Sequence, residues 1–247
     1  MSLSGRLAIV TGGGSGIGRA VCYALADEGA TVIVADIDGG AAGNTAVELP
    51  GEGHQALEVD VREMTSVLAL FENVCDSCST PVSIVVNSAG VIKATKVVEM
   101  EEDSFDDEVR TNLKGTFLVN QAAVKDMLSS GVPEGCIVNV SSIGFKTGFP
   151  SYSAHTASMA GVVAFTKSLA QELVETNIRV NALVAGPTDT PMIADVPDDV
   201  KEKVVASIPL RRLARPEEIA EVAKFLCCPG SSFVTGTAVE VAGGYCA

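Results

Sequence analysis

The chain has no tryptophan, only two histidines and few basic residues. Aromatic residues make up 4% of its 247 positions, and 17 lysines and arginines stand against 31 acidic residues, which gives a formal net charge of −14. Nucleic acids and anionic membrane surfaces are polyanions, so a protein of this charge is a poor partner for either. We therefore expect a small-molecule ligand and no nucleic-acid partner.

Long hydrophobic runs are also missing. No stretch approaches the roughly 20 apolar residues that a membrane-spanning helix needs. The first residues, MSLSGRLAIVTGGG, lack the layout of a signal peptide. The sequence therefore predicts a soluble intracellular protein of the cytoplasm or the mitochondrial matrix, with no membrane span.

Cysteine is present, but not in the pattern of a disulfide framework, because seven is an odd number in a long chain. Cys75 and Cys78 form a C-x-x-C pair, which is found in redox and zinc sites. A structural zinc site needs a second pair of ligands, and the only histidines, His54 and His155, do not provide one. We interpret Cys75 and Cys78 as ordinary thiols near a helix end and expect no metal site.

Short β-branched runs alternate along the chain with helix-length segments. Hydrophobic residues make up 47% of the sequence, and with so few aromatics the core must consist of Val, Ile, Leu and Ala, which suits parallel strands covered on both faces. The alternation is typical of βαβ units with right-handed crossovers. We predict one α/β domain over 1–247, a doubly wound parallel sheet with helices on both faces. Strands are expected at 6–12, 31–36, 54–61, 82–90, 135–142, 178–186 and 238–244, and helices at 16–29, 63–78, 104–129, 156–176 and 216–227.

A glycine-rich turn joins the first expected strand to the first helix. It reads TGGGSGIG and ends at Gly18, and Gly12, Gly16 and Gly18 would allow a tight turn, close approach of a pyrophosphate and close helix–strand packing. The helix N-terminus adds amide donors for a phosphate. Asp36 ends the second strand, where a carboxylate can bond an adenosine ribose and repel a 2′-phosphate. The alternative is a structural turn and an exposed aspartate, but we predict a Rossmann-type site for NAD.

Further segments resemble those of the short-chain dehydrogenase/reductase family over nearly the whole chain. The resemblance implies that Ser142, at the end of VNVSS, polarises a substrate carbonyl, and that Asn112, in TNLKGTF, anchors a proton-relay water. The chain departs from the family at Ser88, within NSAG, and at Ala185, which replaces the proline before GPTDTPM. The residues implied in cofactor binding are Gly12, Ser15, Gly16, Ile17, Gly18, Asp36, Ile37, Asp60, Val61, Asn87, Ala89, Gly90, Met159, Gly186, Thr188 and Thr190.

The catalytic motif of the family, a tyrosine followed four residues later by a lysine, is altered here. The segment MAGVVAFTKSLAQEL resembles the family text that begins at the lysine, which places Met159 at the lysine position and His155 at the tyrosine position. The interval from Ser142 to His155 is the usual one for the family. Tyr152 is followed four residues later by Thr156 and lies three residues before the catalytic position.

These two substitutions change the chemistry that the resemblance implies. In the family the tyrosine exchanges a proton with the substrate oxygen, and the lysine brings the phenol pKa down from about 10 and holds the nicotinamide ribose. The imidazole of His155 has an unperturbed pKa near 6.5 and could exchange protons without that help, although its nitrogens reach a different place. Met159 offers neither a charge nor a donor. We therefore expect a severe loss of turnover.

Three interpretations follow from the altered motif. The chain is an engineered inactive form of a normal enzyme, or a natural non-catalytic member that binds NAD and supports an active partner, or an enzyme whose relay is rebuilt around Ser142 and His155, with or without Tyr152. The first two are also compatible with His155 and Met159 as packing residues of a buried helix face. Turnover of the chain by itself separates the third from the others.

Within the family, the sequence most resembles 3-oxoacyl reductases and the related 17β-hydroxysteroid dehydrogenases. That implies reversible hydride transfer between NAD(H) and either a 3-hydroxyacyl/3-oxoacyl thioester or a steroid 17-hydroxyl. Ser142, Phe149, Tyr152 and Met192 are the predicted substrate contacts, although loop packing would explain the last three equally. Substrate contacts are expected mostly in 92–102, in 143–153 and after Met192. The apolar residues of these stretches form the wider apolar set of Ile92, Val97, Met100, Phe145, Phe149, Tyr152, Met192 and Ile193.

The resemblance also implies an oligomer, because close relatives are usually tetramers. A homotetramer would use the helices over 104–129 and 156–176 as one contact and the last strand as another, and a mixed oligomer with an active reductase is the alternative. Internal packing of amphipathic helices would give the same sequence pattern. Docking of an acidic carrier protein would need a basic patch, for which Arg211, Arg212 and Arg215 are candidates, although a solvated loop explains them better.

Overall fold

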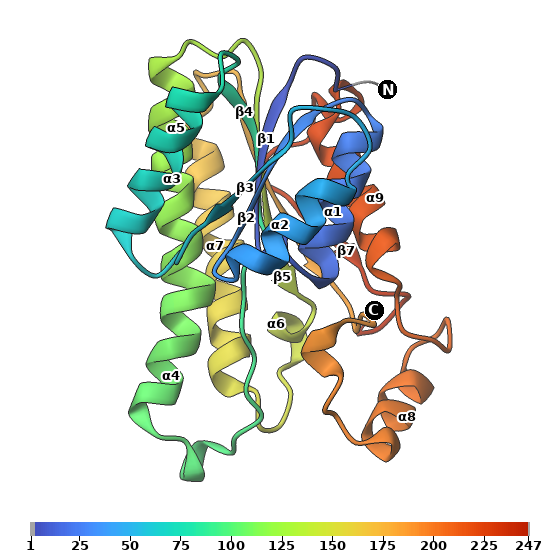
Figure 1. Cartoon of the computed structure of the whole chain (residues 1–247). Helices are drawn as coiled ribbons and strands as arrows, with labels where there is room; N and C mark the ends of the chain where they lie inside the picture. The colour runs from blue at the N-terminus through green and yellow to red at the C-terminus, as the bar shows by residue number, and fades with distance from the viewer. Residues whose placement is uncertain (1–2, 247) are drawn as a thin grey trace.

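The computed structural model describes residues 3–246, in which strands and helices alternate along the chain (Figure 1). The strands are β1 (Leu7–Thr11), β2 (Thr31–Asp36), β3 (Gln55–Glu58), β4 (Val82–Asn87), β5 (Gly135–Ser142), β6 (Ile178–Ala185) and β7 (Ala238–Val241). The α-helices are α1 (Gly16–Asp27), α2 (Gly39–Glu48), α3 (Met64–Ser77), α4 (Glu102–Val109), α5 (Thr116–Ser129), α6 (Gly144–Thr147), α7 (Ser153–Glu172), α8 (Asp198–Ser207) and α9 (Pro216–Cys227).

The strands form one parallel sheet in the order β3-β2-β1-β4-β5-β6-β7. Every residue of β1 and β4 is buried, which explains why these strands read as unbroken apolar runs and not as alternating patterns. The strand order changes direction between β1 and β4, and a sheet of this type binds ligands at the carboxyl ends of the strands beside that point. The predicted doubly wound α/β fold is confirmed.

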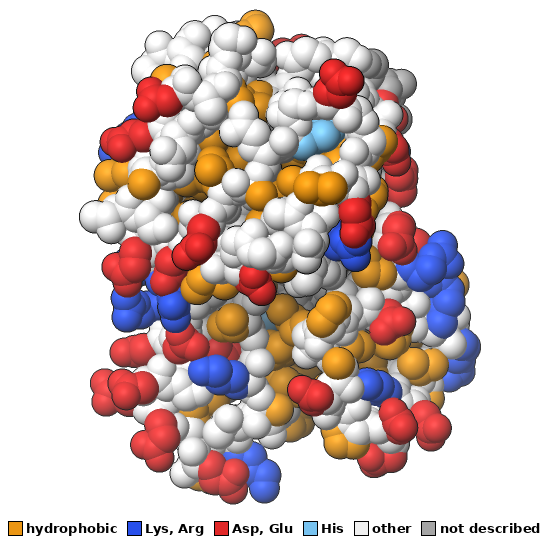
Figure 2. All heavy atoms as spheres, viewed as in Figure 1, with side chains coloured by type: hydrophobic (Ala, Val, Ile, Leu, Met, Phe, Trp, Pro, Cys, Tyr) orange, Lys and Arg blue, Asp and Glu red, His pale blue; other side chains and the backbone are white. Residues whose placement is uncertain are grey.

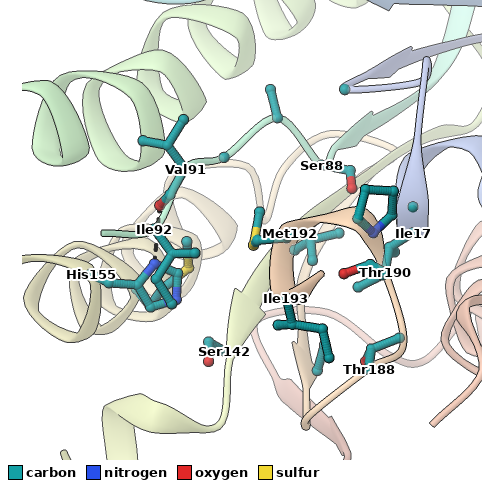
Figure 3. A pocket seen from close by; sticks show the side chains of 18 of the residues that line it. Ile17, Ser88, Val91, Ile92, Ser142, His155, Thr188, Thr190, Met192 and Ile193 are labelled. Atoms are coloured by element: carbon teal, nitrogen blue, oxygen red, sulfur yellow. Dashed lines mark hydrogen bonds between the residues drawn. The ribbon is translucent and has the colours of Figure 1, made fainter. Parts of the chain in front are cut away.

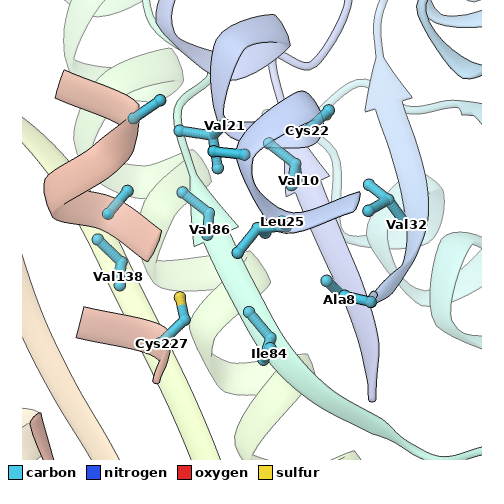
Figure 4. Packing of buried hydrophobic residues seen from close by; sticks show 14 of the residues in the cluster. Ala8, Val10, Val21, Cys22, Leu25, Val32, Ile84, Val86, Val138 and Cys227 are labelled. Atoms are coloured by element: carbon cyan, nitrogen blue, oxygen red, sulfur yellow. The ribbon is translucent and has the colours of Figure 1, made fainter. Parts of the chain in front are cut away.

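Helices cover both faces of the sheet because successive strand residues point to opposite sides. On one face Val10 of β1 and Ile84 of β4 belong to the same core cluster as Leu25 of α1, together with residues of α2 and α9 (Figure 4). On the other face Ile9 and Val85 pack with residues of α3, α5 and α7. The two clusters hold the sheet rigidly, so the ends of its strands are fixed positions for functional side chains.

The structure differs from the predicted elements at several boundaries. The helix expected over 104–129 is divided, because the π-helical segment η2 (Arg110–Gly115) lies between α4 and α5 and contains Asn112. The helix expected at 156–176 begins earlier, at Ser153, so that His155 lies in its first turn. Asp60 and Val61 follow β3 instead of belonging to it. α2, α6 and α8 were not among the predicted helices.

Between residues 3 and 246, none of the helices combines the length and the apolarity needed to cross a membrane. In the same range no three His, Cys, Asp or Glu side chains converge on a possible metal position. All seven cysteines are free thiols, and the pair Cys75 and Cys78 lies at the C-terminal end of α3. His54 has a structural contact, because its Nδ1 accepts a hydrogen bond from the amide of Val32 at 3.0 Å.

Candidate active site

The carboxyl ends of the strands open into a cleft of about 610 Å³. Its walls come from the turn after β1, the ends of β2, β4, β5 and β6, the start of α7, and α8. In the space-filling view, hydrophobic side chains gather around the hollow in the lower half of the molecule (Figure 2). The cleft therefore joins the predicted cofactor loop to the predicted catalytic helix.

The turn between β1 and α1 leaves no room for side chains. Gly12 has a φ of 67°, and a Cβ there would lie 2.8 Å from the backbone of Ala89. A Cβ on Gly18 would lie only 2.1 Å from the carbonyl oxygen of Gly12. Ser15 is the N-cap of α1 but its side chain makes no capping bond, so the first amides of the helix stay available for a phosphate.

Two backbone amides fix the carboxylate of Asp36 at the edge of the cleft. Oδ2 accepts from the amide of Gly14 at 2.9 Å, and Oδ1 accepts from the amide of Asp38 at 3.1 Å. Both of these bonds come from the backbone, and within residues 3–246 no cationic side chain pairs with this carboxylate. Ile37 follows it in the cleft wall with 58% of its surface exposed, as a residue that could cover a flat ring.

Arg62 and Lys201 are the cations that line the cleft among the described residues, and both are engaged. The guanidinium of Arg62 bonds both oxygens of Asp60, at 2.8 Å for the closest pair, and also bonds Asp107 at 3.1 Å. The bonds from Arg62 hold the pKa of Asp60 below its usual range. Lys201 donates from Nζ to the carbonyl oxygen of Ala194 at 2.9 Å. The carboxylate of Asp36 therefore faces a cleft without a free cation to bind a 2′-phosphate.

Ser142 and His155 lie around the same part of the cleft (Figure 3). Ser142 ends β5, and its Oγ accepts from the amide of Gly144 at 3.3 Å, which leaves the hydroxyl hydrogen free for another acceptor. His155 is 7% exposed, and its Nδ1 lies 3.2 Å from the carbonyl oxygen of Val91. Burial lowers the pKa of the His155 imidazole, and the bond to Val91 opposes this only in part.

Met159 occupies the next turn of α7 and lines the same cleft, buried to the same degree as His155. Its backbone carbonyl accepts a hydrogen bond from Ser141 Oγ at 3.0 Å, and its thioether offers no charge. Lys93, on the loop after β4, is paired with Asp107 at 2.9 Å, and Lys146, on α6, is paired with Glu240 at 3.0 Å. No ammonium group replaces the lysine that the family motif implies, as far as residues 3–246 show.

Nearly all predicted site residues line the cleft, but two do not. Asn87 is buried behind the wall, where its Nδ2 donates to Asn139 Oδ1 at 2.8 Å and ties β4 to β5. Asn112 is also behind the wall and clamps Val91, since Oδ1 accepts from the Val91 amide at 2.8 Å and Nδ2 donates to the Val91 carbonyl at 2.9 Å. Of the wider apolar set, Val97, Met100 and Phe145 also lie outside the lining.

Some lining residues had no counterpart in the sequence prediction. Tyr245 stacks on Phe149 with ring centroids 5.8 Å apart, and α8 contributes Val200, Lys201 and Val204. The spacing of Val200 and Val204, four residues apart, was a detectable sign of an apolar helix face.

Comparison with known proteins agrees with this geometry. The family described as "Enoyl-(Acyl carrier protein) reductase" matches residues 12–246. The chain is 43% identical to a (3R)-3-hydroxyacyl-CoA dehydrogenase of Homo sapiens, with 98% of this chain and 96% of the relative covered. It is 37% identical to the 3-oxoacyl-[acyl-carrier-protein] reductase FabG of Thermotoga maritima, with 99% of each chain covered.

Solved structures match as closely. A structure described as a short chain dehydrogenase/reductase family protein superposes with a TM-score of 0.90 at 34% identity and covers 100% of both chains. A short-chain type dehydrogenase/reductase from Mycobacterium marinum gives a TM-score of 0.93 at 32% identity, over 99% of this chain and 96% of that one. The chain therefore belongs to the short-chain dehydrogenase/reductase family of oxidoreductases.

Proposed function

We propose that the protein is an NAD(H)-dependent oxidoreductase that interconverts a hydroxyl and a keto group on a 3-hydroxyacyl or 3-oxoacyl thioester. The observation that carries this proposal is the shared cleft: Ser142 and His155 line the same cavity as the glycine turn and the carboxylate of Asp36. A substrate oxygen between Ser142 and His155 would then lie beside the nicotinamide of a dinucleotide whose other half is bound by the glycine turn and Asp36.

The residues of the cleft fit a nicotinamide dinucleotide. A turn in which Gly12 and Gly18 leave no room for side chains, followed by uncapped amides of α1, suits a pyrophosphate. The unneutralised carboxylate of Asp36 suits the two ribose hydroxyls of NAD and repels the 2′-phosphate of NADP. When bound, the nicotinamide supplies hydride transfer. Gly186, Thr188 and Thr190 would complete its site from the loop after β6.

The proposed substrate class rests on the relatives and on the lining of the cleft. The human relative is named for 3-hydroxyacyl-CoA and the Thermotoga relative for a 3-oxoacyl carrier protein. The substrate half of the cleft is apolar and suits an acyl chain, and a flat hydroxysteroid would use the same surface. The residues that form it are Ile92, Ile143, Phe149, Met192, Ile193, Val200, Val204 and Leu213.

We assign Ser142 to the substrate oxygen and His155 to proton transfer, and we expect turnover to be slow. The hydroxyl hydrogen of Ser142 is free, so it can polarise the oxygen of the substrate. Met159 provides no donor for the nicotinamide ribose and no charge for the proton step. Because a positioned acid or base contributes about 100- to 10,000-fold to a rate, the altered motif costs activity on this scale. A subunit that binds NAD and only supports an active partner is the alternative.

We further propose that the protein is a homotetramer that pairs through the outer surfaces of α5 and α7. Phe117 of α5 is 40% exposed and meets Phe165 of α7 edge to face, with centroids 6.0 Å apart. Leu128 is 52% exposed further along α5. Large apolar side chains exposed together on one face are typical of an interface.

The test compares this chain with the double variant His155→Tyr/Met159→Lys. NADH binding is followed by fluorescence titration, and turnover is measured with acetoacetyl-CoA and with estradiol. We expect both proteins to bind NADH and the double variant to turn over at least about 100-fold faster. Tyr152→Phe in the double-variant background is the matched control, because this nearby phenol lies in the same cleft. Absence of NADH binding by both proteins would overturn the cofactor proposal, and binding without any gain in turnover would overturn the assignment of the catalytic positions.

A further inference from the structure

We infer that His155 acts as a general base whose Nε2 takes the proton of a substrate hydroxyl, so that the neutral ring is the form that oxidises the alcohol and the imidazolium is the form that reduces the ketone. The inference rests on the proposed function and goes beyond it, because it assigns the tautomer, the accepting atom and the protonation state that each direction requires.

The bond to Val91 determines which nitrogen of His155 carries the proton. A backbone carbonyl oxygen can only accept, so Nδ1, 3.2 Å away, must be the donor. A neutral imidazole has one N–H, and burial favours the neutral ring. Nε2 therefore carries an unprotonated lone pair, which can accept a proton and cannot give one.

The Val91 carbonyl is itself held in place by Asn112. The side chain of Asn112 bonds both the amide and the carbonyl of Val91, at 2.8 and 2.9 Å, and also donates to Ser158 Oγ at 3.1 Å. Ser158 in turn donates to the backbone carbonyl of His155 at 2.7 Å. These bonds form a closed network around the ring, so Asn112 is a positioning residue that acts on His155 through Val91.

Nε2 remains open to the cleft. Within residues 3–246 it makes no hydrogen bond and is not among the enclosed, unpaired polar atoms, while the ring lines the cavity. Ser142 offers a free hydroxyl hydrogen to the same part of the cleft (Figure 3). The pair thus presents one donor and one acceptor. A hydroxyl group satisfies both, whereas a keto oxygen has no proton to donate and would face the Nε2 lone pair.

The surroundings of the ring oppose its protonation. Burial is the main cause that lowers its pKa, and no neighbouring carboxylate offsets that effect. The ammonium of Lys93, on the loop after β4, and the carboxylate of Asp107, on α4, pair with each other at 2.9 Å. The titratable side chains on the loop after β4, on α4, on η2, on α6 and just before α7 are Lys93, Lys96, Glu99, Glu101, Glu102, Asp103, Asp106, Asp107, Glu108, Arg110, Lys114, Lys146 and Tyr152.

The step balances in atoms and electrons. The carbinol carbon gives a hydride, and with it two electrons, to NAD⁺, while the O–H bond breaks and its proton passes to Nε2 of His155. The C=O bond forms between carbon and oxygen, and the products are the ketone, NADH and an imidazolium. The imidazolium then releases its proton to water through the cleft and restores the neutral tautomer.

The test is the pH profile of kcat/KM in both directions on the unaltered chain, with (R)-3-hydroxybutyryl-CoA and NAD⁺ for oxidation and acetoacetyl-CoA and NADH for reduction. Oxidation should stay level from alkaline pH to below about pH 6.5, the ordinary imidazole value, and then fall about tenfold per pH unit as the ring is protonated. Reduction should fall about tenfold per pH unit above the pKa of the ring, because the proton donor disappears.

Two variants separate this inference from the proposed function. His155→Gln should bind NADH normally and lose at least about 100-fold in oxidation, while His155→Tyr/Met159→Lys should turn over in both directions. An oxidation profile that is unchanged by His155→Gln, or a chain that is inert in both directions beside an active double variant, overturns the inference and leaves the proposed function intact. If none of these proteins binds NADH, the proposed function itself fails.

Discussion

Replacement of Asp36 by asparagine tests the cofactor assignment without altering the shape of the cleft. Asparagine has nearly the same size and keeps one acceptor for the amide of Gly14 or Asp38, which bond the native carboxylate at 2.9 and 3.1 Å. What it removes is the negative charge. The change in preference between NADH and NADPH therefore measures the effect of that charge.

The size of the effect follows from two contributions. Hydrogen bonds to a charged group are worth about 1.5–3 kcal/mol and those to a neutral group about 0.5–1.5 kcal/mol, so the ribose of NADH loses about 1 kcal/mol. Two unit charges 4 Å apart near a protein surface interact by about 4 kcal/mol, and relief of part of this repulsion should favour NADPH by about 1–3 kcal/mol. Together the preference for NADH should fall by about 2–4 kcal/mol, or about 30- to 1,000-fold.

The assay is a pair of fluorescence titrations, with NADH and with NADPH, at the same ionic strength. Asp38→Asn is the matched control, because Asp38 carries the same charge two residues away but caps α2 through Ala41 and does not line the cleft. It should change the ratio of affinities by less than threefold, on the order of 0.5 kcal/mol. If Asp36→Asn leaves the ratio unchanged, or Asp38→Asn changes it equally, the assignment of Asp36 to the adenosine ribose is refuted.

Three other substitutions test the frame around the site. Gly18→Ala places a Cβ 2.1 Å from the Gly12 carbonyl oxygen and should cost about 1–3 kcal/mol in a urea melt with a loss of NADH affinity, so retained affinity would contradict the close packing of the turn. Leu25→Ala removes a fully buried side chain of α1 away from the cleft and should cost about 2–5 kcal/mol in the same melt with NADH affinity unchanged. Burial raises the pKa of the Glu108 carboxyl. At pH values between the ordinary glutamate pKa and this raised pKa, the folded protein therefore binds more protons than the unfolded chain, and its stability falls as the pH rises. Glu108→Gln should reduce the difference between the unfolding free energies measured in urea melts at pH 5 and at pH 7. An unchanged difference would contradict the raised pKa of Glu108.

Much of the fold could be predicted because the sheet is buried on both faces. The runs LAIVT and TVIVAD are almost wholly buried, and such runs are readable without knowledge of their neighbours. The glycine turn was equally predictable. At Gly12 and Gly18 a Cβ would collide with backbone atoms, so only glycine fits, and glycine is visible in the sequence. Both features depend on local residue type, which a single sequence contains.

The division of the helix over 104–129 was not predictable, because the six-residue π segment η2 is too short to show an apolar period of its own. The segment matters for the site, since it carries Asn112. The role of Asn112 depends on Val91, 21 residues earlier, and the tautomer of His155 depends on the same residue, 64 positions away. Contacts of this range belong to the tertiary structure and have no local signal.

His155 and Met159 make chemical sense as a pair. A tyrosine at 155 beside Met159 would be a buried phenol with an unperturbed pKa near 10 and no lysine at 159 to lower it. A lysine at 159 beside His155 would place an ammonium near an imidazole that must become positively charged when it accepts the substrate proton, and like charges disfavour that state. The thioether of Met159 lines the same cleft but carries no charge, so it does not repel the imidazolium. Each single reversion therefore combines one residue of the family relay with one residue of the histidine site, and only the double change restores a matched pair.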